Sequence, residues 1–287
     1  MEIECYGFMR LLVHVQRAMT IMMTQVRAQT QTTLLGFCAL PFKPLRLSVY
    51  RYYAFTTTLH LIFSPTDSQH SKKPGTQGYV DNPPPLGFEV PKLSDLSKTR
   101  SNWSDVKLPV DFLVLTVEDC EFLGFFSYLE EPFKSYLKDL GYVYFGFMGN
   151  AGEKKLKVAL MRSLKGSASP GGSLTVATDA IRILRPKALF LVGACSGLDR
   201  GKVKLGDVVV SSKLTTAGYK TPPSRDVSNL IRHAADGWQA PLENPDALEV
   251  RGHCDTVVLS RPEGVGKDFN QRCPEAAAVE MGGEGKP

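Results

Sequence analysis

Two acidic side chains stand where a sheet would present them to a substrate. Glu118 and Glu121 follow the apolar run 112–116 within five residues. That run is short and contains β-branched residues, so it predicts a buried strand. A carboxylate at the carboxyl end of such a strand can act as a general base. Glu121 is the first catalytic candidate and Glu118 its rival; the alternative is a carboxylate that only begins a helix.

A second candidate is a run of small residues after another predicted strand, at 188–192. The run comprises Gly193, Ala194, Cys195, Ser196 and Gly197. Small residues allow backbone N–H groups to approach a ligand closely, and a serine hydroxyl adds one more hydrogen bond. A nucleophilic Cys195 is the weaker alternative, because no histidine lies near it in the sequence. A plain tight turn is the other interpretation of this run.

A third segment makes the pattern more specific. The residues Leu-Gly-Asp-Val-Val-Val at 205–210 open the next strand. Strand, small-residue loop and this strand together resemble the nucleoside phosphorylase superfamily: purine nucleoside and uridine phosphorylases and methylthioadenosine/adenosylhomocysteine nucleosidases. The resemblance covers about residues 109–284. It implies an α/β fold, three-layer α/β/α with a central mixed sheet, and cleavage of the N-glycosidic bond of a purine or related nucleoside.

The resemblance also assigns roles to the candidates. Glu121 stands where the nucleosidase branch carries the carboxylate that activates water. The phosphorolytic branches have a Gly- and Arg-containing phosphate loop there, and neither residue type occurs between Thr116 and Phe122. Hydrolysis is therefore slightly favoured, with phosphate possible as a co-substrate and no other cofactor or metal expected. The loop 193–197 would line the ribose pocket, and Gly166 matches a glycine-bearing turn beside it.

The last motif both supports and weakens this reading. Residues 278–281 resemble the superfamily's Val-Glu-Met-Glu, so Glu280 and Met281 are expected at the sugar, but Gly282 replaces the second Glu. A lost carboxylate acceptor costs about 1.5–3 kcal/mol per hydrogen bond. Superfamily members also continue through a strand that bears the base-side acid, so the domain resembles one truncated at its C-terminus. The alternative is therefore a catalytically impaired nucleoside-binding or regulatory module, and enzymatic activity is left open.

The remaining periodicity supplies the elements that would position these residues. Further strands are predicted at 142–147, 157–161, 253–260 and 276–281, and helices after Glu118, at 172–184 and at about 224–235. Alternation of strands and helices implies a sheet covered on both faces.

The N-terminal part has a different composition. Residues 1–66 carry no acidic residue between Cys5 and Thr66, which predicts a poorly structured, basic extension or a mitochondrial transit segment. Residues 67–108 are a Pro/Ser-rich linker by composition. The folded domain is expected at 109–287.

Charge and cysteines limit the classes of function. Residues 1–100 hold 11 Lys and Arg against 6 Asp and Glu, whereas the rest hold 23 of each. The C-terminal part of the sequence has no cluster of basic residues that would indicate nucleic-acid binding. The six cysteines are scattered and no apolar run spans a membrane, so a cytoplasmic protein is expected, with mitochondria as the alternative. A nucleoside is the expected small-molecule partner, and the resemblance implies a homo-oligomer.

Overall fold

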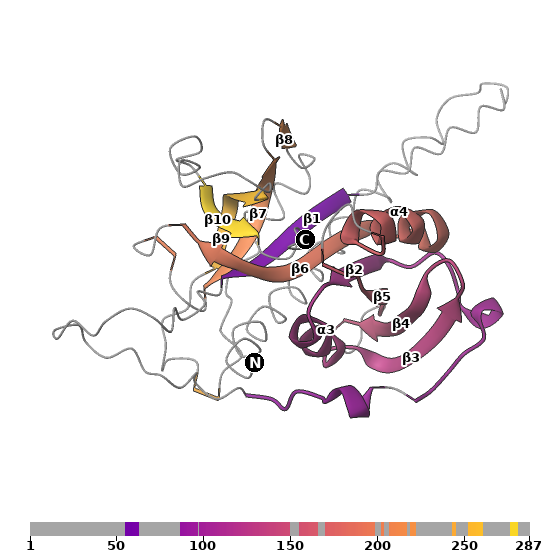
Figure 1. Cartoon of the computed structure of the whole chain (residues 1–287). Helices are drawn as coiled ribbons and strands as arrows, with labels where there is room; N and C mark the ends of the chain where they lie inside the picture. Colours follow the sequence, from indigo (N-terminus) through magenta and orange to yellow (C-terminus); the bar gives the residue numbers. More distant parts are fainter. Residues whose placement is uncertain are drawn as a thin grey trace, which may run out of the picture.

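The computed structural model describes residues 55–62, 87–96, 98–149, 155–165, 170–198, 202–203, 207–216, 219–221, 243–244, 252–260 and 276–280. The fold is α/β, with a mixed sheet between helices, as the sequence predicts (Figure 1). Its strand order is β1-β7-β9-β10-β6-β2-β5-β4-β3.

The first part of the sheet is built around one strand buried on both faces. β2 (Phe112–Thr116) lies between β5 (Leu156–Arg162) and β6 (Ala188–Gly197) and is parallel to both. β4 (Gly141–Met148) and β3 (Glu130–Leu137) extend this sheet with antiparallel pairings. All five residues of β2 are buried, as expected for a parallel strand covered on both faces.

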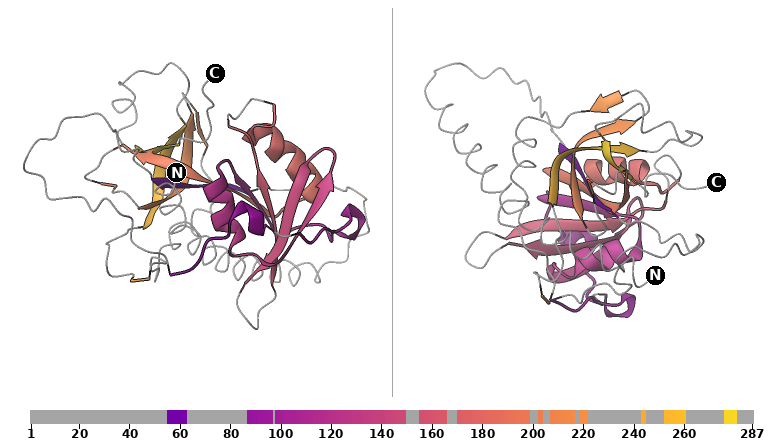
Figure 2. Two further views of the ribbon diagram at one scale, coloured as in Figure 1. Left: turned by 60° about the horizontal axis from the view of Figure 1, so that its bottom comes forward. Right: turned by 90° about the vertical axis from the view of Figure 1, so that its left-hand side faces the viewer.

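Two helices cover opposite faces of these strands (Figure 2). α3 (Asp119–Phe126) packs Phe122, Phe125 and Phe126 against the even-numbered residues of β2. α4 (Ser173–Leu184) packs Ala180 and Leu184 against the odd-numbered residues Leu113 and Leu115. Side chains alternate along a strand, so β2 anchors both helices. We call β2 to β5 with α3 and α4 the layered part.

The remaining strands pair in a cycle. They are β1 (Phe55–Ile62), β7 (Val208–Thr216), β8 (Tyr219–Thr221), β9 (Gly252–Ser260) and β10 (Ala276–Glu280). β1 pairs with β6 and β7, β7 with β9, β9 with β10, and β10 with β6. Together with β6, the strands β1, β7, β9 and β10 form a closed ring, and β8 pairs with β7 outside it. We call β1, β6, β7, β9 and β10 the strand ring; β6 joins it to the layered part.

Two features of the ring differ from the sequence-based expectations. The segment 1–66, expected to be poorly structured, contains β1, which pairs along both its edges. The small residues 193–197, expected as a loop, continue β6, because β1 pairs with residues 193–195 and β10 with residues 195–197. The helix expected at 224–235 lies outside the described residues.

Short contacts close the ends and the edge of the layered part. Asp111 accepts a hydrogen bond from the backbone of Lys157 (2.9 Å) and pairs with Lys187 (2.6 Å), which ties together the starts of β2, β5 and β6. Residues 99–101 run along β3, whose Lys134 backbone bonds Thr99 and Ser101. That contact shields an otherwise open sheet edge. Two 3-10 turns, η2 (Leu93–Asp95) and η3 (Trp103–Asp105), flank it.

Among the described residues, the helices are all too short or too polar to cross a membrane. The same residues contain no group of three or more His, Cys, Asp or Glu side chains arranged to hold a metal ion.

Candidate active site

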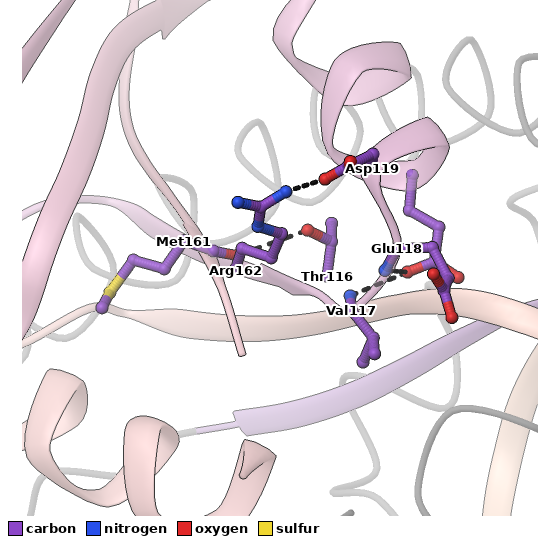
Figure 3. A network of polar contacts seen from close by, with 7 residues as sticks. Thr116, Val117, Glu118, Asp119, Met161 and Arg162 are labelled. Atoms are coloured by element: carbon purple, nitrogen blue, oxygen red, sulfur yellow. Dashed lines mark hydrogen bonds and ion pairs between the residues drawn. The ribbon is translucent and has the colours of Figure 1, made fainter. Parts of the chain in front are cut away.

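Glu121 lies in the first turn of α3, beyond the carboxyl end of β2. Its side chain is buried, with 2% exposure. Oε2 accepts hydrogen bonds from the backbone N–H groups of Val117 (2.8 Å) and Glu118 (2.9 Å). Figure 3 labels these two donor residues in the turn between β2 and α3. Helix N-termini favour negative charge, and these donors hold the carboxylate in one orientation. The carboxylate therefore caps the start of α3, whether or not it also has a chemical role.

The other oxygen of this carboxylate faces the small-residue segment of β6. A Cβ at Gly193 would lie 3.7 Å from Oε1 of Glu121, which is an ordinary van der Waals distance. The carboxylate and the backbone of Gly193 are therefore neighbours. The structure thus brings together two residues, 72 positions apart, that the sequence singled out separately.

Basic side chains at the end of β5 and just after it reach across to the same turn. Arg162, the last residue of β5, pairs with Asp119, and Figure 3 shows its guanidinium directed at that carboxylate. Lys165 pairs with Glu118 at 2.5 Å. The Arg162 guanidinium also lies 5.9 Å from the centre of the Phe122 ring. These half-exposed pairs join the ends of β2 and β5, and each pair neutralises its own charge.

Backbone hydrogen bonds join the same two strand ends. The Ser163 N–H donates to the Thr116 carbonyl (2.9 Å), and the Thr116 hydroxyl donates to the Met161 carbonyl (3.5 Å). The turn that carries Glu121 is therefore anchored at both strands beside it.

The other predicted site residues are placed unevenly. Cys195 is buried in an apolar cluster with Val203, Val209 and Ala278, so its thiol packs inside the ring. Ala194, Ser196, Gly197 and Glu280 are placed by their backbone only: Glu280 pairs with Cys195, and Ser196 with Val279. Gly166 and Met281 lie outside the described residues.

A second polar pair, which the sequence analysis did not single out, lies in the strand ring. His253 Nε2 is 2.8 Å from Oδ2 of Asp207. Asp207 is buried, with 1% exposure, whereas 21% of the His253 side chain is exposed. The two residues are 46 positions apart, so no local sequence pattern predicts that they pair. Arg162 was also missed, although its place just after a predicted strand is the signal that identified the loop 193–197.

Comparisons with known proteins agree with the resemblance in the sequence. A curated relative from Amphimedon queenslandica, described as a death domain-containing ATP nucleosidase, is 24% identical over 221 residues. That alignment covers 63% of this chain and 40% of the relative, so the chain spans about two fifths of the relative's length. No protein-family model matches the chain.

Two solved structures that are similar to this chain are a nucleosidase and a phosphorylase. S-adenosylhomocysteine nucleosidase from Streptococcus pyogenes is 14% identical with a TM-score of 0.42, covering 60% of this chain and 73% of that one. Purine nucleoside phosphorylase from Toxoplasma gondii is 13% identical with a TM-score of 0.43, covering 60% and 68%. The names of these relatives come from the superfamily that the motifs of this chain resemble, at identities of 13–24%.

Proposed function

We propose that this protein hydrolyses the N-glycosidic bond of a purine nucleoside or a related nucleotide, with Glu121 as the general base. One observation carries the proposal: the Glu121 carboxylate is buried, accepts hydrogen bonds from two backbone donors at one oxygen, and has its other oxygen beside Gly193 of β6. A carboxylate held in one orientation is what general-base catalysis needs.

The chemistry follows from the transition state of glycoside cleavage. The sugar becomes oxocarbenium-like as the bond to the base breaks. A water molecule beside Gly193 would give its proton to Oε1 of Glu121 as its oxygen bonds to C1′. The electron pair of the broken bond goes to the nitrogen of the departing base. The negative carboxylate also stabilises the positive sugar electrostatically.

Two considerations favour water over phosphate as the nucleophile. The curated relative is named as a nucleosidase. In addition, Arg162 at the end of β5 and Lys165 shortly after it are already paired with Asp119 and Glu118, which flank Glu121 in the sequence. A phosphate co-substrate would have to displace these carboxylates. The relative's name also points to an adenine nucleotide as a substrate to test.

A catalytically impaired binding module is the second candidate. Gly282 stands where the superfamily's motif carries a ribose-binding glutamate. A pocket without that acceptor would bind ribose more weakly. Restoring the residue with Gly282→Glu should then tighten nucleoside binding, which calorimetry would measure.

The test is release of free base by the full chain from ATP, adenosine, methylthioadenosine, inosine and uridine, with and without phosphate, followed by chromatography. We expect release from a purine substrate without phosphate. Glu121→Gln should lower kcat at least 100-fold, because the amide cannot accept the proton, yet its oxygen can still accept the two backbone hydrogen bonds. Arg182→Gln, on the exposed face of α4, is the matched control. Release that requires phosphate, or full activity in Glu121→Gln, would contradict the proposal.

A further inference from the structure

Cleavage of a nucleoside requires an acid as well as a base. A purine is a poor leaving group as an anion, so a proton must reach it as the bond breaks. Glu121 takes a proton from water and is committed to that role in the proposed reaction. Four charged side chains of the same turn and the end of β5 pair with one another, Arg162 with Asp119 and Lys165 with Glu118.

The pair of Asp207 and His253 has the features of a proton donor. The Nε2 of His253 lies 2.8 Å from a carboxylate oxygen that is almost completely buried. A buried carboxylate that accepts a hydrogen bond from Nε2 orients the ring and leaves Nδ1 for proton transfer. The partial exposure of His253 makes the ring accessible to a ligand.

The strand pairings place this pair at the end of the ring where the site lies. β7 is antiparallel to β1, and β9 is parallel to β7, so β7 and β9 begin where β1 and β6 end. His253 pairs with Val209. Val209 pairs with His60, which in turn pairs with Gly193. Three interstrand steps of about 4.8 Å each place the Cα atoms of His253 and Gly193 at most roughly 14 Å apart. A bound nucleoside together with the imidazole side chain is long enough to bridge that distance.

We infer that His253, held by Asp207, is the general acid that protonates the leaving base. The C1′–N bond breaks, its electron pair goes to the base, and the base nitrogen system takes the Nδ1 proton of the imidazolium. Neutral His253 then recovers a proton from solvent. Asp207 acts as a positioning residue, since it touches the imidazole and not the substrate. This inference rests on the proposed N-glycosidic cleavage.

The test compares two leaving groups in the full-length protein. One substrate is the purine nucleoside or nucleotide that is cleaved fastest, and the other is 4-nitrophenyl β-D-ribofuranoside, whose nitrophenolate departs without a proton. His253→Gln should lower kcat/KM for the purine substrate by roughly 10²–10⁴-fold, the usual contribution of a general acid. For the nitrophenyl riboside we expect a change of less than about threefold, because that step needs no acid. Asp207→Asn should give the same selective loss without altering the imidazole itself.

Each outcome separates the inference from the function on which it rests. Equal losses on both substrates, or no loss on the purine substrate, would assign the pair a purely structural role and overturn the inference. If the wild-type protein cleaves neither substrate, the proposed function fails and the inference fails with it. Arg182→Gln, which removes an exposed ion pair with Asp179 outside the ring, is the control and should leave both rates unchanged.

Discussion

The layered part and the strand ring use different ways of building a sheet. In the layered part β2, β3, β4 and β5 follow one another along the chain. In the sequence, α3 connects β2 to β3 and α4 connects β5 to β6. In the strand ring, Phe55 of β1 pairs with Ala188 of β6, and β10 closes the cycle from the far end of the sequence. Local segments therefore supply a scaffold, and distant segments complete it at β6, where Glu121 meets Gly193.

The two parts nevertheless share an apolar core. One buried cluster contains Phe122 and Phe125 of α3, Phe190 of β6, and Val208 and Val210 of β7. A substitution that disrupts this cluster should therefore destabilise both parts. A substitution that disrupts a strand pairing of the ring should destabilise the ring first. The following changes test that difference.

Phe125→Ala should have the largest effect. The ring is completely buried, so its removal should cost about 3–5 kcal/mol of unfolding free energy through lost burial and a cavity. Urea unfolding followed by circular dichroism would measure it. Leu93→Ala, at a side chain that is 49% exposed, is the control, with an expected change within about 0.5 kcal/mol. A loss below 1 kcal/mol in Phe125→Ala would show that the shared cluster does not support the fold.

Leu59→Pro should come next, with an effect confined to the ring. Residue 59 pairs with β6 on one edge and β7 on the other, and proline removes a backbone donor there. We expect a loss of roughly 3 kcal/mol. Hydrogen exchange should show faster exchange in β1 and β7 and little change in β2 and β5. Leu59→Ala keeps the donor and should perturb exchange much less; equal exposure of both parts in the proline variant would contradict the division.

Glu121→Ala should have a smaller effect on stability. It removes the acceptor for the N–H groups of Val117 and Glu118 at the start of α3, which costs about 1 kcal/mol in comparable caps. Glu121→Gln retains an acceptor and should unfold within a few tenths of a kcal/mol of the wild type. Thermal unfolding of both variants, read with their activities, separates the capping role from the chemical one. Equal destabilisation by both would remove capping as the cause.

Tyr128→Phe should have the smallest effect, visible only in alkali. Burial raises the pKa of Tyr128 well above its ordinary value of 10.0. Its hydroxyl therefore ionises more easily in the unfolded chain, and the protein should lose stability as the pH rises above about 10. Tyr128→Phe should weaken that alkaline loss in urea unfolding between pH 9 and 11. Tyr136→Phe, at an exposed position, is the control; identical alkaline slopes in all three proteins would contradict the prediction.

The sequence predicted the layered part better than the ring. The strand at 112–116 and the helix at 172–184 agree closely with β2 and α4, because a short apolar run and a helical stripe are local signals. β3 was missed, since its edge position leaves several residues exposed and breaks the apolar pattern. β1 was missed because an acid-poor composition carries no information about a pairing partner far along the chain.

The candidate site residues show the same difference between local signals, which the sequence reveals, and long-range pairings, which it does not. Glu121 and Gly193 were recognised from their places after predicted strands, and the structure places them side by side, while their roles stay predictions. The Asp207–His253 pair depends on the register between β7 and β9, which no spacing in the sequence reveals. Homo-oligomerisation, a cytoplasmic or mitochondrial location and the absence of a cofactor stay predictions.

The closure of the ring by β1 also sets the order of events during synthesis. β1 leaves the ribosome first, whereas its partner β6 follows roughly 130 residues later. At about 5–20 residues per second, that delay is roughly 6–25 seconds. For that time the segment FTTTLHLI is a strand-forming sequence without its native neighbours, the type of segment that associates with other chains. The yield of folded protein in a cell should therefore depend on chaperones that bind nascent chains and on the rate of translation between β1 and β6.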